Sequence, residues 1–340
     1  MSPPLSFSAF FSTLASLPHL LHDILDPPLH PWADPTHVYA GNMAPVGEME
    51  PIDCPIIEGK LPVSLKGVYI RNASAPKILT GHFNLMNGFG VANTGLAFFA
   101  SKLFALCDSD LPYEINLTKV GDIETLGRWE FEKKFMSNMN AHPKVDLDTK
   151  ETFAFSWSLT FPYLTLLRFD ENGVKQNEVP ISSIKQPCFI HDFAITKRFA
   201  VFHETQLVYS LGKVVTGSGS LVEYEPNKVP RIGILPKYAM DDSELKWFPV
   251  PGFNTIHVLN AWESEDDENE IVFVAPNILS VDNIFNLKIY ASLGKVKINI
   301  KTGDVSREKI SPRNLEFGSI NPSHVGRQTR ARGCEKSLWA

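Results

Sequence analysis

Three of the ten histidines stand just before, at the start of, or within short strand-forming runs. His142 lies before such a run in NAHPKVD, His191 at the start of one in PCFIHDFAIT, and His257 within one in PGFNTIHVLNAWE. Their separations, 49 and 66 residues, are close to the ~40–50 residues of one propeller blade plus insertions. Equivalent strands of successive blades would bring the three imidazoles to one axis. A neutral imidazole binds iron, zinc, copper or nickel, so we predict an all-histidine metal site whose residue types leave iron and zinc open.

Other catalytic classes lack their motifs in this chain. There is no Gly-x-Ser-x-Gly elbow, no His-Glu-x-x-His pair, no Walker loop and no dinucleotide fingerprint. The four cysteines are far apart without a Cys-x-x-Cys pair, which excludes a zinc ribbon and a dense disulfide framework. The net charge of −6 offers no basic surface for a nucleic-acid backbone, so no nucleic-acid partner is expected.

The elements that must position the histidines are short strands. Gly, Pro, Asn and Asp separate apolar runs at 96–106, 152–157, 164–170, 192–196, 198–204, 270–276 and 295–300. The turn sequences DENGV at 170–174 and KTGDV at 301–305 join neighbouring runs, which is typical of antiparallel hairpins rather than strand-helix-strand units. A train of hairpins over 340 residues predicts an all-β chain, as a propeller, barrel or large sandwich.

Residues 1–30 have a different composition. They are rich in Ser, Pro, Phe and Leu and contain no Lys or Arg, so neither a secretory signal nor a transit peptide is clear. The apolar residues fall near helical spacing with an interruption at Pro18, which predicts short amphipathic N-terminal helices. Such helices could dock on the protein's own core or lie shallowly in a membrane surface; a spanning helix is not expected.

Longer segments carry a family resemblance. The segments that carry it are, in order, DCPIIEGKLPVSLKGVYIRN, GVANTGLAFFASKLFALCDSDLPY, HPKVD, FIHDFAIT, PGFNTIHVLNAWE, VAPNILS and LEFGSINPSHVG. In these segments the chain closely resembles the carotenoid cleavage dioxygenases, especially the plastid class-4 branch of plants. The resemblance implies a seven-bladed β-propeller that holds one Fe(II) on its axis through four histidines, three of them steadied by glutamates. It further implies that iron activates O2 to cleave a conjugated double bond of a carotenoid, expected to be the 9,10 bond, into apocarotenoid carbonyl products.

The resemblance also assigns residues. His142, His191 and His257 match the first three iron ligands, and Glu316 matches one of the glutamates that hold them. Asp108 stands where the family has a second such glutamate, and its side chain is one methylene shorter. The remaining candidates His82, His203 and His324 fall where the family uses no ligand.

Two departures from the family shape the expected organisation. A long segment that normally follows Asn72 is missing here, and the resemblance stops near Gly326, before the family's fourth histidine. We therefore expect a targeting or amphipathic segment at 1–30, an incomplete propeller at 31–326 and an unrelated tail at 327–340. The expected protein is a monomeric plastid enzyme that takes its carotenoid and O2 at a membrane surface or plastoglobule. An inactive partial propeller and a zinc-dependent hydrolase are the alternatives.

Overall fold

The chain was analysed as a computed structural model that describes residues 92–131, 138–210, 222–279, 281 and 290–328. Within these ranges nearly all regular structure is β-strand, and the last element is a short 3-10 turn, η7 (Pro322–His324). This confirms the all-β class. No helix among the described residues is long and apolar enough to cross a membrane. The helices expected in residues 1–30 lie outside the described residues.

Four antiparallel sheets of four strands follow one another along the chain. The first contains, in spatial order, β1 (Gly95–Phe99), β2 (Lys102–Leu106), β3 (Tyr113–Leu117) and β4 (Ile123–Arg128). The second contains β5 (Lys144–Val145), β6 (Thr152–Trp157), β7 (Leu164–Phe169) and β8 (Val179–Pro180). In both sheets each strand pairs with its neighbour in sequence, which is the meander of a propeller blade.

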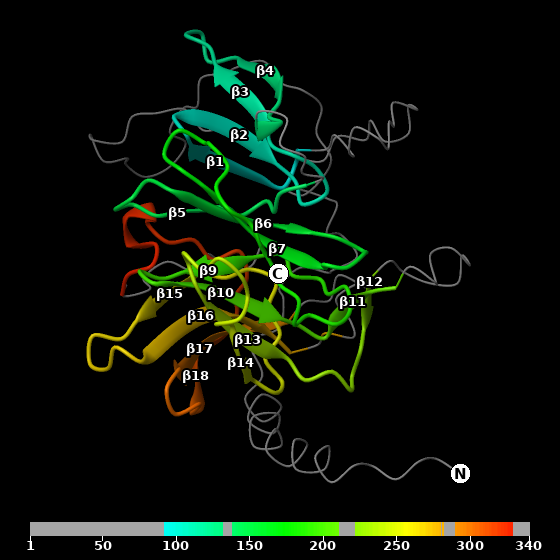
Figure 1. The fold of residues 1–340 in the computed structure, drawn as a ribbon, viewed down its shortest axis with the longest axis vertical. Coiled ribbons are helices and arrows are strands. Elements are labelled where there is room, and N and C mark those ends of the chain that lie inside the picture. The colour runs from blue at the N-terminus through cyan, green and yellow to red at the C-terminus, as the bar shows by residue number, and fades with distance from the viewer. Residues whose placement is uncertain (1–91, 132–137, 211–221, 280, 282–289, 329–340) are drawn as a thin grey trace.

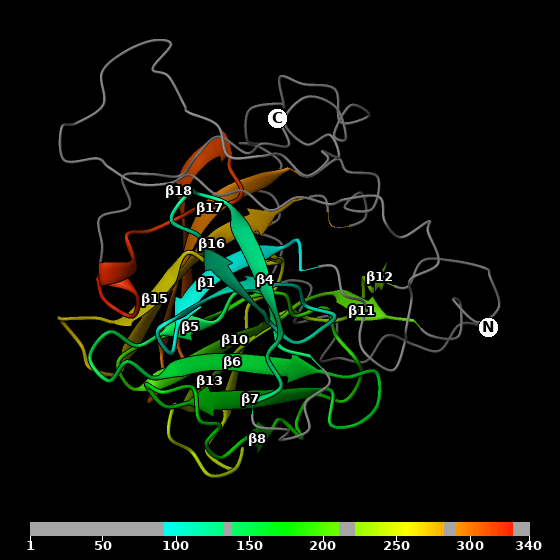
Figure 2. The same cartoon turned by 90° about the horizontal axis from the view of Figure 1, so that it is seen from above.

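The third and fourth sheets repeat this arrangement. The third contains β9 (Phe193–Ile195), β10 (Phe199–Glu204), β13 (Arg231–Pro236) and β14 (Lys246–Pro249). A separate hairpin interrupts it between β10 and β13, formed by β11 (Leu207–Tyr209) and β12 (Val222–Tyr224). The fourth contains β15 (Asn260–Glu263), β16 (Glu270–Ile278), β17 (Ala291–Asn299) and β18 (Val305–Asn314). In Figure 1 the sheets succeed one another from β1–β4 at the top to β15–β18 at the bottom. Figure 2 looks from above, and in that view β1 and β4 appear between β16–β18 and β6–β8.

Apolar clusters hold each sheet against the next one in the chain. Phe104 of β2 and Phe169 of β7 share one buried cluster between the first and second sheets. Phe155 of β6 meets Phe193 of β9 edge to face, with ring centroids 5.5 Å apart, between the second and third sheets. Val201 of β10 and Phe273 of β16 share a third cluster between the third and fourth sheets. The sheets are therefore consecutive blades of a propeller, each packed face to face on its neighbours.

The structure confirms two of the turns predicted from the sequence and shows one turn that was not predicted. Gly173 and Gly303 adopt φ of 81° and 84° in the predicted turns, between β7 and β8 and between β17 and β18. The run at 96–106, in contrast, is two strands rather than one, because Ala100 and Ser101 turn the chain with φ of 50° and 57°. A two-residue turn with both φ values positive usually contains Asn or Gly, so Ala-Ser carries no turn signal.

His203 is an isolated polar side chain in the apolar interior. It lies on β10 with 2% of its surface exposed, and its ring packs against Phe253 at a centroid distance of 5.5 Å. Neither ring nitrogen makes a well-formed hydrogen bond. Burial lowers the pKa of His203 to about 3, although the nearby backbone of Phe253 acts in the opposite direction. His203 is therefore neutral in the folded protein at physiological pH.

Acid should destabilise the fold through His203. Its pKa is depressed in the folded state, so its contribution is fully present above the unfolded pKa of about 6.5 and is lost as the pH falls toward 3, at about 1.4 kcal/mol per pH unit. We expect His203→Phe to remove this part of the pH dependence of the free energy of unfolding, measured by denaturant titration between pH 7 and pH 4. The exposed His324, changed to Ala, is the control that should keep the wild-type slope. Equal slopes in wild type and His203→Phe would contradict the assignment.

Candidate metal centre

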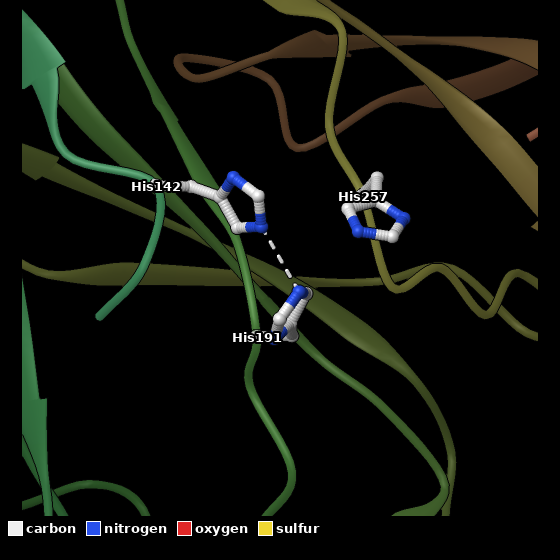
Figure 3. A group of neighbouring side chains, drawn as sticks. All are labelled: His142, His191 and His257. Atoms are coloured by element: carbon white, nitrogen blue, oxygen red, sulfur yellow. Dashed lines mark hydrogen bonds between the residues drawn. The ribbon is translucent and has the colours of Figure 1, made fainter. Parts of the chain in front are cut away.

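Each of the three histidines immediately precedes the first strand of its blade. His142 lies two residues before β5, His191 two residues before β9, and His257 three residues before β15. The expectation that His257 lies within a strand is wrong, since β15 begins only at Asn260. The equivalent placement explains why the three rings meet although 49 and 66 residues separate them along the chain. Figure 3 shows them converging from three separate segments.

Asparagine side chains fix the segment that carries His142. Asn138 Oδ1 accepts a hydrogen bond from the backbone N–H of Trp157 at 3.0 Å, and Asn138 Nδ2 donates to the carbonyl of Trp157 at 2.9 Å. Asn140 Oδ1 accepts from the N–H of Phe155 at 2.9 Å. These amides extend the edge of β6 as a neighbouring strand would, because an asparagine amide offers the same donor and acceptor as a peptide group. The NMNAH sequence is thus held in an extended path that ends at the His142 ring.

Backbone bonds and an aromatic neighbour orient His191. Phe189 N–H donates to the carbonyl of Leu207 on β11 at 2.9 Å, which attaches the segment to the inserted hairpin. The ring of Phe189 lies nearly parallel to that of His191, with an interplanar angle of 7° and a centroid distance of 5.8 Å. One side of the His191 imidazole therefore faces an apolar surface.

The three imidazoles lie close enough to share one ion. His142 Nε2 and His191 Nε2 are 3.0 Å apart, and the ligand nitrogens of all three rings lie within 4.8 Å of one another. The ring of His257 is 5.3 Å from that of His142 and 4.9 Å from that of His191, centroid to centroid. Two nitrogens at right angles on an ion with bonds of about 2.1 Å would be about 3.0 Å apart. The spacing of His142 and His191 fits that arrangement.

Two carboxylates hold the far nitrogens of two of the rings. Asp108, in the loop between β2 and β3, makes a short hydrogen bond through Oδ2 to His191 Nδ1, so the shorter side chain does reach an imidazole. Its Oδ1 accepts from the N–H of Ala141, next to His142, at 2.7 Å. Glu316 Oε2 accepts from His257 Nδ1 at 2.9 Å and from the N–H of Phe317 at 2.6 Å. A carboxylate at Nδ1 fixes the tautomer that leaves Nε2 free to bind a metal.

The electrostatics of the site favour a cation at its centre. Burial lowers the pKa of His142 to about 3; Asp192 opposes this shift, while His191 and His257 add to it, so His142 is neutral. The Asp108 carboxylate raises the pKa of His191 despite the opposing effect of burial. Asp192 pairs with Lys144 at 2.8 Å, which leaves the charges of Asp108 and Glu316 to match a divalent ion.

Acids close to the histidines in sequence play other parts. Asp146 forms an ion pair with Lys237, and Glu263 accepts from the side chain of Thr196 at 2.8 Å. Asp192, next to His191 in sequence, makes its hydrogen bonds away from the rings. The partners actually used come from 83 and 59 residues away in the chain, so sequence proximity could not have found them.

The residues present fit a metal ion. Three imidazoles, which bind metals in their neutral form, face one point, and carboxylates orient two of them. The second oxygen of Glu316, Oε1, is buried without a hydrogen-bond partner. A buried carboxylate oxygen without a donor is costly unless positive charge lies nearby. Among the described residues no other group of three histidine, cysteine or acidic side chains has this geometry. Of the histidines expected not to bind, His203 and His324 lie outside the cluster, and His82 lies outside the described residues.

Comparison with known proteins shows the family to which the chain belongs. The family model described as retinal pigment epithelial membrane protein (RPE65) matches residues 80–332. The chain belongs to this family, the carotenoid oxygenases. The resemblance recognised in the sequence is thereby confirmed.

Two relatives and one solved structure illustrate the family. The chain is 41% identical to "Probable carotenoid cleavage dioxygenase 4, chloroplastic" of Arabidopsis thaliana, over 95% of this chain and 67% of that protein. It is 46% identical to "Zeaxanthin 7,8(7',8')-cleavage dioxygenase, chromoplastic" of Crocus sativus, over 72% of this chain and 66% of that protein. The lignostilbene dioxygenase of Pseudomonas brassicacearum superposes with a TM-score of 0.61 at 23% identity, over 70% of this chain and 52% of that one, which shows the shared fold.

The carotenoid oxygenase relatives are longer than this chain. The chain spans about two thirds of the length of the two curated relatives and about half of the solved structure. The alignment with the Arabidopsis relative runs over 400 positions but contains only 95% of the 340 residues of this chain, about 323, an excess of about 77 positions. That excess agrees with an internal segment that is shorter here. Its expected place after Asn72, and the division at residues 30 and 326, stay predictions.

The bond from Asp108 to His191 should matter to metal affinity. Asp108→Asn removes the negative charge at His191 Nδ1, and outer hydrogen-bond partners of this kind typically contribute ~10–100-fold to metal affinity. We expect a loss of that size in the affinity for a divalent metal ion, measured by anaerobic calorimetric titration with Fe(II) as the probe. Asp148→Asn is the matched control, since Asp148 is a surface residue with its side chain 66% exposed. A normal affinity in Asp108→Asn would show that the carboxylate does not support the centre.

Proposed function

We propose that this chain is an iron(II)-dependent dioxygenase that cleaves a conjugated double bond of a carotenoid. The observation that carries the proposal is the convergence of His142, His191 and His257 ahead of three consecutive blades, in a chain of the carotenoid oxygenase family. His142, His191 and His257 would hold the ion, and Asp108 and Glu316 would hold two of their rings. Bound iron would supply the redox chemistry that lets O2 react with a polyene.

The protein's own part in this chemistry is orientation. Asp108 and Glu316 keep the Nδ1 protons of His191 and His257 on the side away from the centre. All-histidine ligation gives the ion no anionic ligand. The two carboxylates would instead supply the compensating negative charge through their hydrogen bonds to the ligating imidazoles. No side chain is required to abstract a substrate proton, because cleavage of the double bond by O2 is an oxidation at carbon.

Aromatic side chains beside the histidines favour an apolar, planar substrate. Phe317 lies against the His257 ring at a centroid distance of 4.6 Å and keeps 38% of its surface exposed. Phe189 covers one side of His191 and meets Tyr209, whose ring stacks on Trp157 at 4.8 Å with an angle of 8°. A conjugated chain can lie along such flat surfaces and exclude water from the reacting carbons.

We further propose which double bond is cleaved, where in the cell the protein acts and that it is a monomer. The 9,10 double bond is the expected target, which gives a ring-bearing ketone and an apocarotenal, and the 7,8 bond named for the Crocus relative is its main competitor. The relatives' names support a plastid location. Residues 1–30 would lead the carotenoid from a membrane surface or plastoglobule to a monomeric propeller at 31–326, with residues 327–340 as a separate tail.

The enzymatic proposal is tested by metal content and product together. The purified chain, reconstituted anaerobically with Fe(II) and then exposed to 18O2 and β-carotene micelles, should form labelled carbonyl products whose masses distinguish 9,10 from 7,8 cleavage. The same chain loaded with Zn(II) should form none, because zinc has no redox chemistry. Full iron occupancy without product would favour the inactive propeller, and hydrolysis restored by zinc alone would favour the hydrolase.

The ligand assignment is tested by histidine substitution. His257→Ala should lower the iron content of the purified protein well below one equivalent per chain, measured by elemental analysis, because it removes one of three converging nitrogens. His324→Ala is the matched control, since this histidine lies in η7 and contributes only backbone groups to its hydrogen bonds. Equal iron content in the two variants would refute the assignment of His257.

A further inference from the structure

Asp192 touches all three segments that carry the histidines. It directly follows His191 in the chain. Its Oδ1 pairs with Lys144 Nζ at 2.8 Å, and Lys144 lies two residues after His142. Its Oδ2 accepts from the N–H of Val258 at 2.8 Å, and Val258 directly follows His257. One side chain therefore joins three blades at points within two residues of each proposed ligand.

The bonds of Asp192 leave it little freedom. Its side chain is only 3% exposed, and Oδ1 also accepts from the N–H of Phe193 at 2.8 Å, which fixes the carboxylate to its own backbone. Charge-assisted bonds in a buried site are short and directional, so displacement of either partner segment would leave a buried charge or a buried N–H unsatisfied. The bond to Val258 also crosses between neighbouring blades, from the segment before β9 to the segment before β15.

The role of Asp192 differs from that of the other acids of the site. Asp108 and Glu316 each bond directly to a ring, whereas the hydrogen bonds of Asp192 go to a lysine and to backbone amides. We propose that Asp192 is the positioning residue that sets the mutual spacing of the His142, His191 and His257 segments, and so prepares the metal centre before any ion binds. Only the metal-binding part of its test rests on the proposed function.

An isosteric substitution isolates the role. In Asp192→Asn an NH2 group replaces either Oδ1, where Lys144 and the Phe193 N–H both lose their acceptor, or Oδ2, where the Val258 N–H loses its acceptor. Lys144→Met breaks only the link to the His142 segment, and Lys144→Arg restores a cation there. Glu204→Gln is the control, because Glu204 is a similarly buried carboxylate paired with Lys228 at 2.8 Å, and neither residue adjoins a proposed ligand.

The first readout needs no metal. In metal-free protein labelled with 15N-histidine, ring 1H–15N spectra should show shifted signals for His142, His191 and His257 in Asp192→Asn. In Lys144→Met the shift should be largest at His142, and Lys144→Arg should return it toward the wild-type position. Glu204→Gln should leave all three unchanged. Unshifted His142 and His257 signals in Asp192→Asn would overturn the proposal; should that variant not fold, an unshifted His142 in Lys144→Met would overturn it.

The second readout is binding of Co(II), followed by its visible absorption. Asp192→Asn should weaken binding at least tenfold and alter the ligand-field bands, while Glu204→Gln keeps both at wild-type values. Wild-type affinity and bands in folded Asp192→Asn would overturn the positioning role. A wild-type chain that binds no Co(II) would count against the metal centre itself, and the ring spectra would still decide the role of Asp192.

Discussion

His142 Nε2 and His191 Nε2 approach each other closely at the centre of this protein, and two nitrogen lone pairs at that separation repel unless a proton or a cation lies between them. The approach of His142 and His191 to 3.0 Å is therefore the constraint that the surrounding structure must satisfy. It does so by holding the rings from outside: a carboxylate binds the far nitrogen of His191 and another that of His257. Burial keeps His142 uncharged, so that its ring retains one nitrogen lone pair that can bind an ion.

The blades provide the precision that this contact needs. The packing of a blade determines the position of a histidine that stands just before its first strand. The large apolar clusters between neighbouring sheets fix that packing. The three rings lie on connecting segments rather than on strands, so each of these segments must itself be fixed to the blades. The asparagines of the NMNAH segment answer this problem for His142 by bonding to β6 with side-chain amides.

Sequence reasoning found what depends on local pattern. Strands such as β6 and β10 show as short apolar runs, and the glycine turns at 173 and 303 have distinctive residues. The three histidines could be predicted as one cluster because each stands at an equivalent place in its blade, although the number of residues between them varies. The turn at Ala100 and Ser101 was missed since neither residue prefers positive φ. Strand β18 was missed since polar residues stand on both of its faces and only Val305 and Ile310 are large apolar residues.

The acids of the site show the limit of such reasoning more sharply. Which carboxylate meets which ring is decided by how blades are placed against one another, and nothing in residues 192, 263 or 146 states that placement. Only family resemblance pointed to Asp108 and Glu316. Asp192 is adjacent to His191 in the sequence, yet its part lies in bonds to Lys144 and Val258 on two other segments. A residue adjacent to a ligand can thus serve the site through the ligand's neighbours, because three buried segments that share one carboxylate cannot move independently.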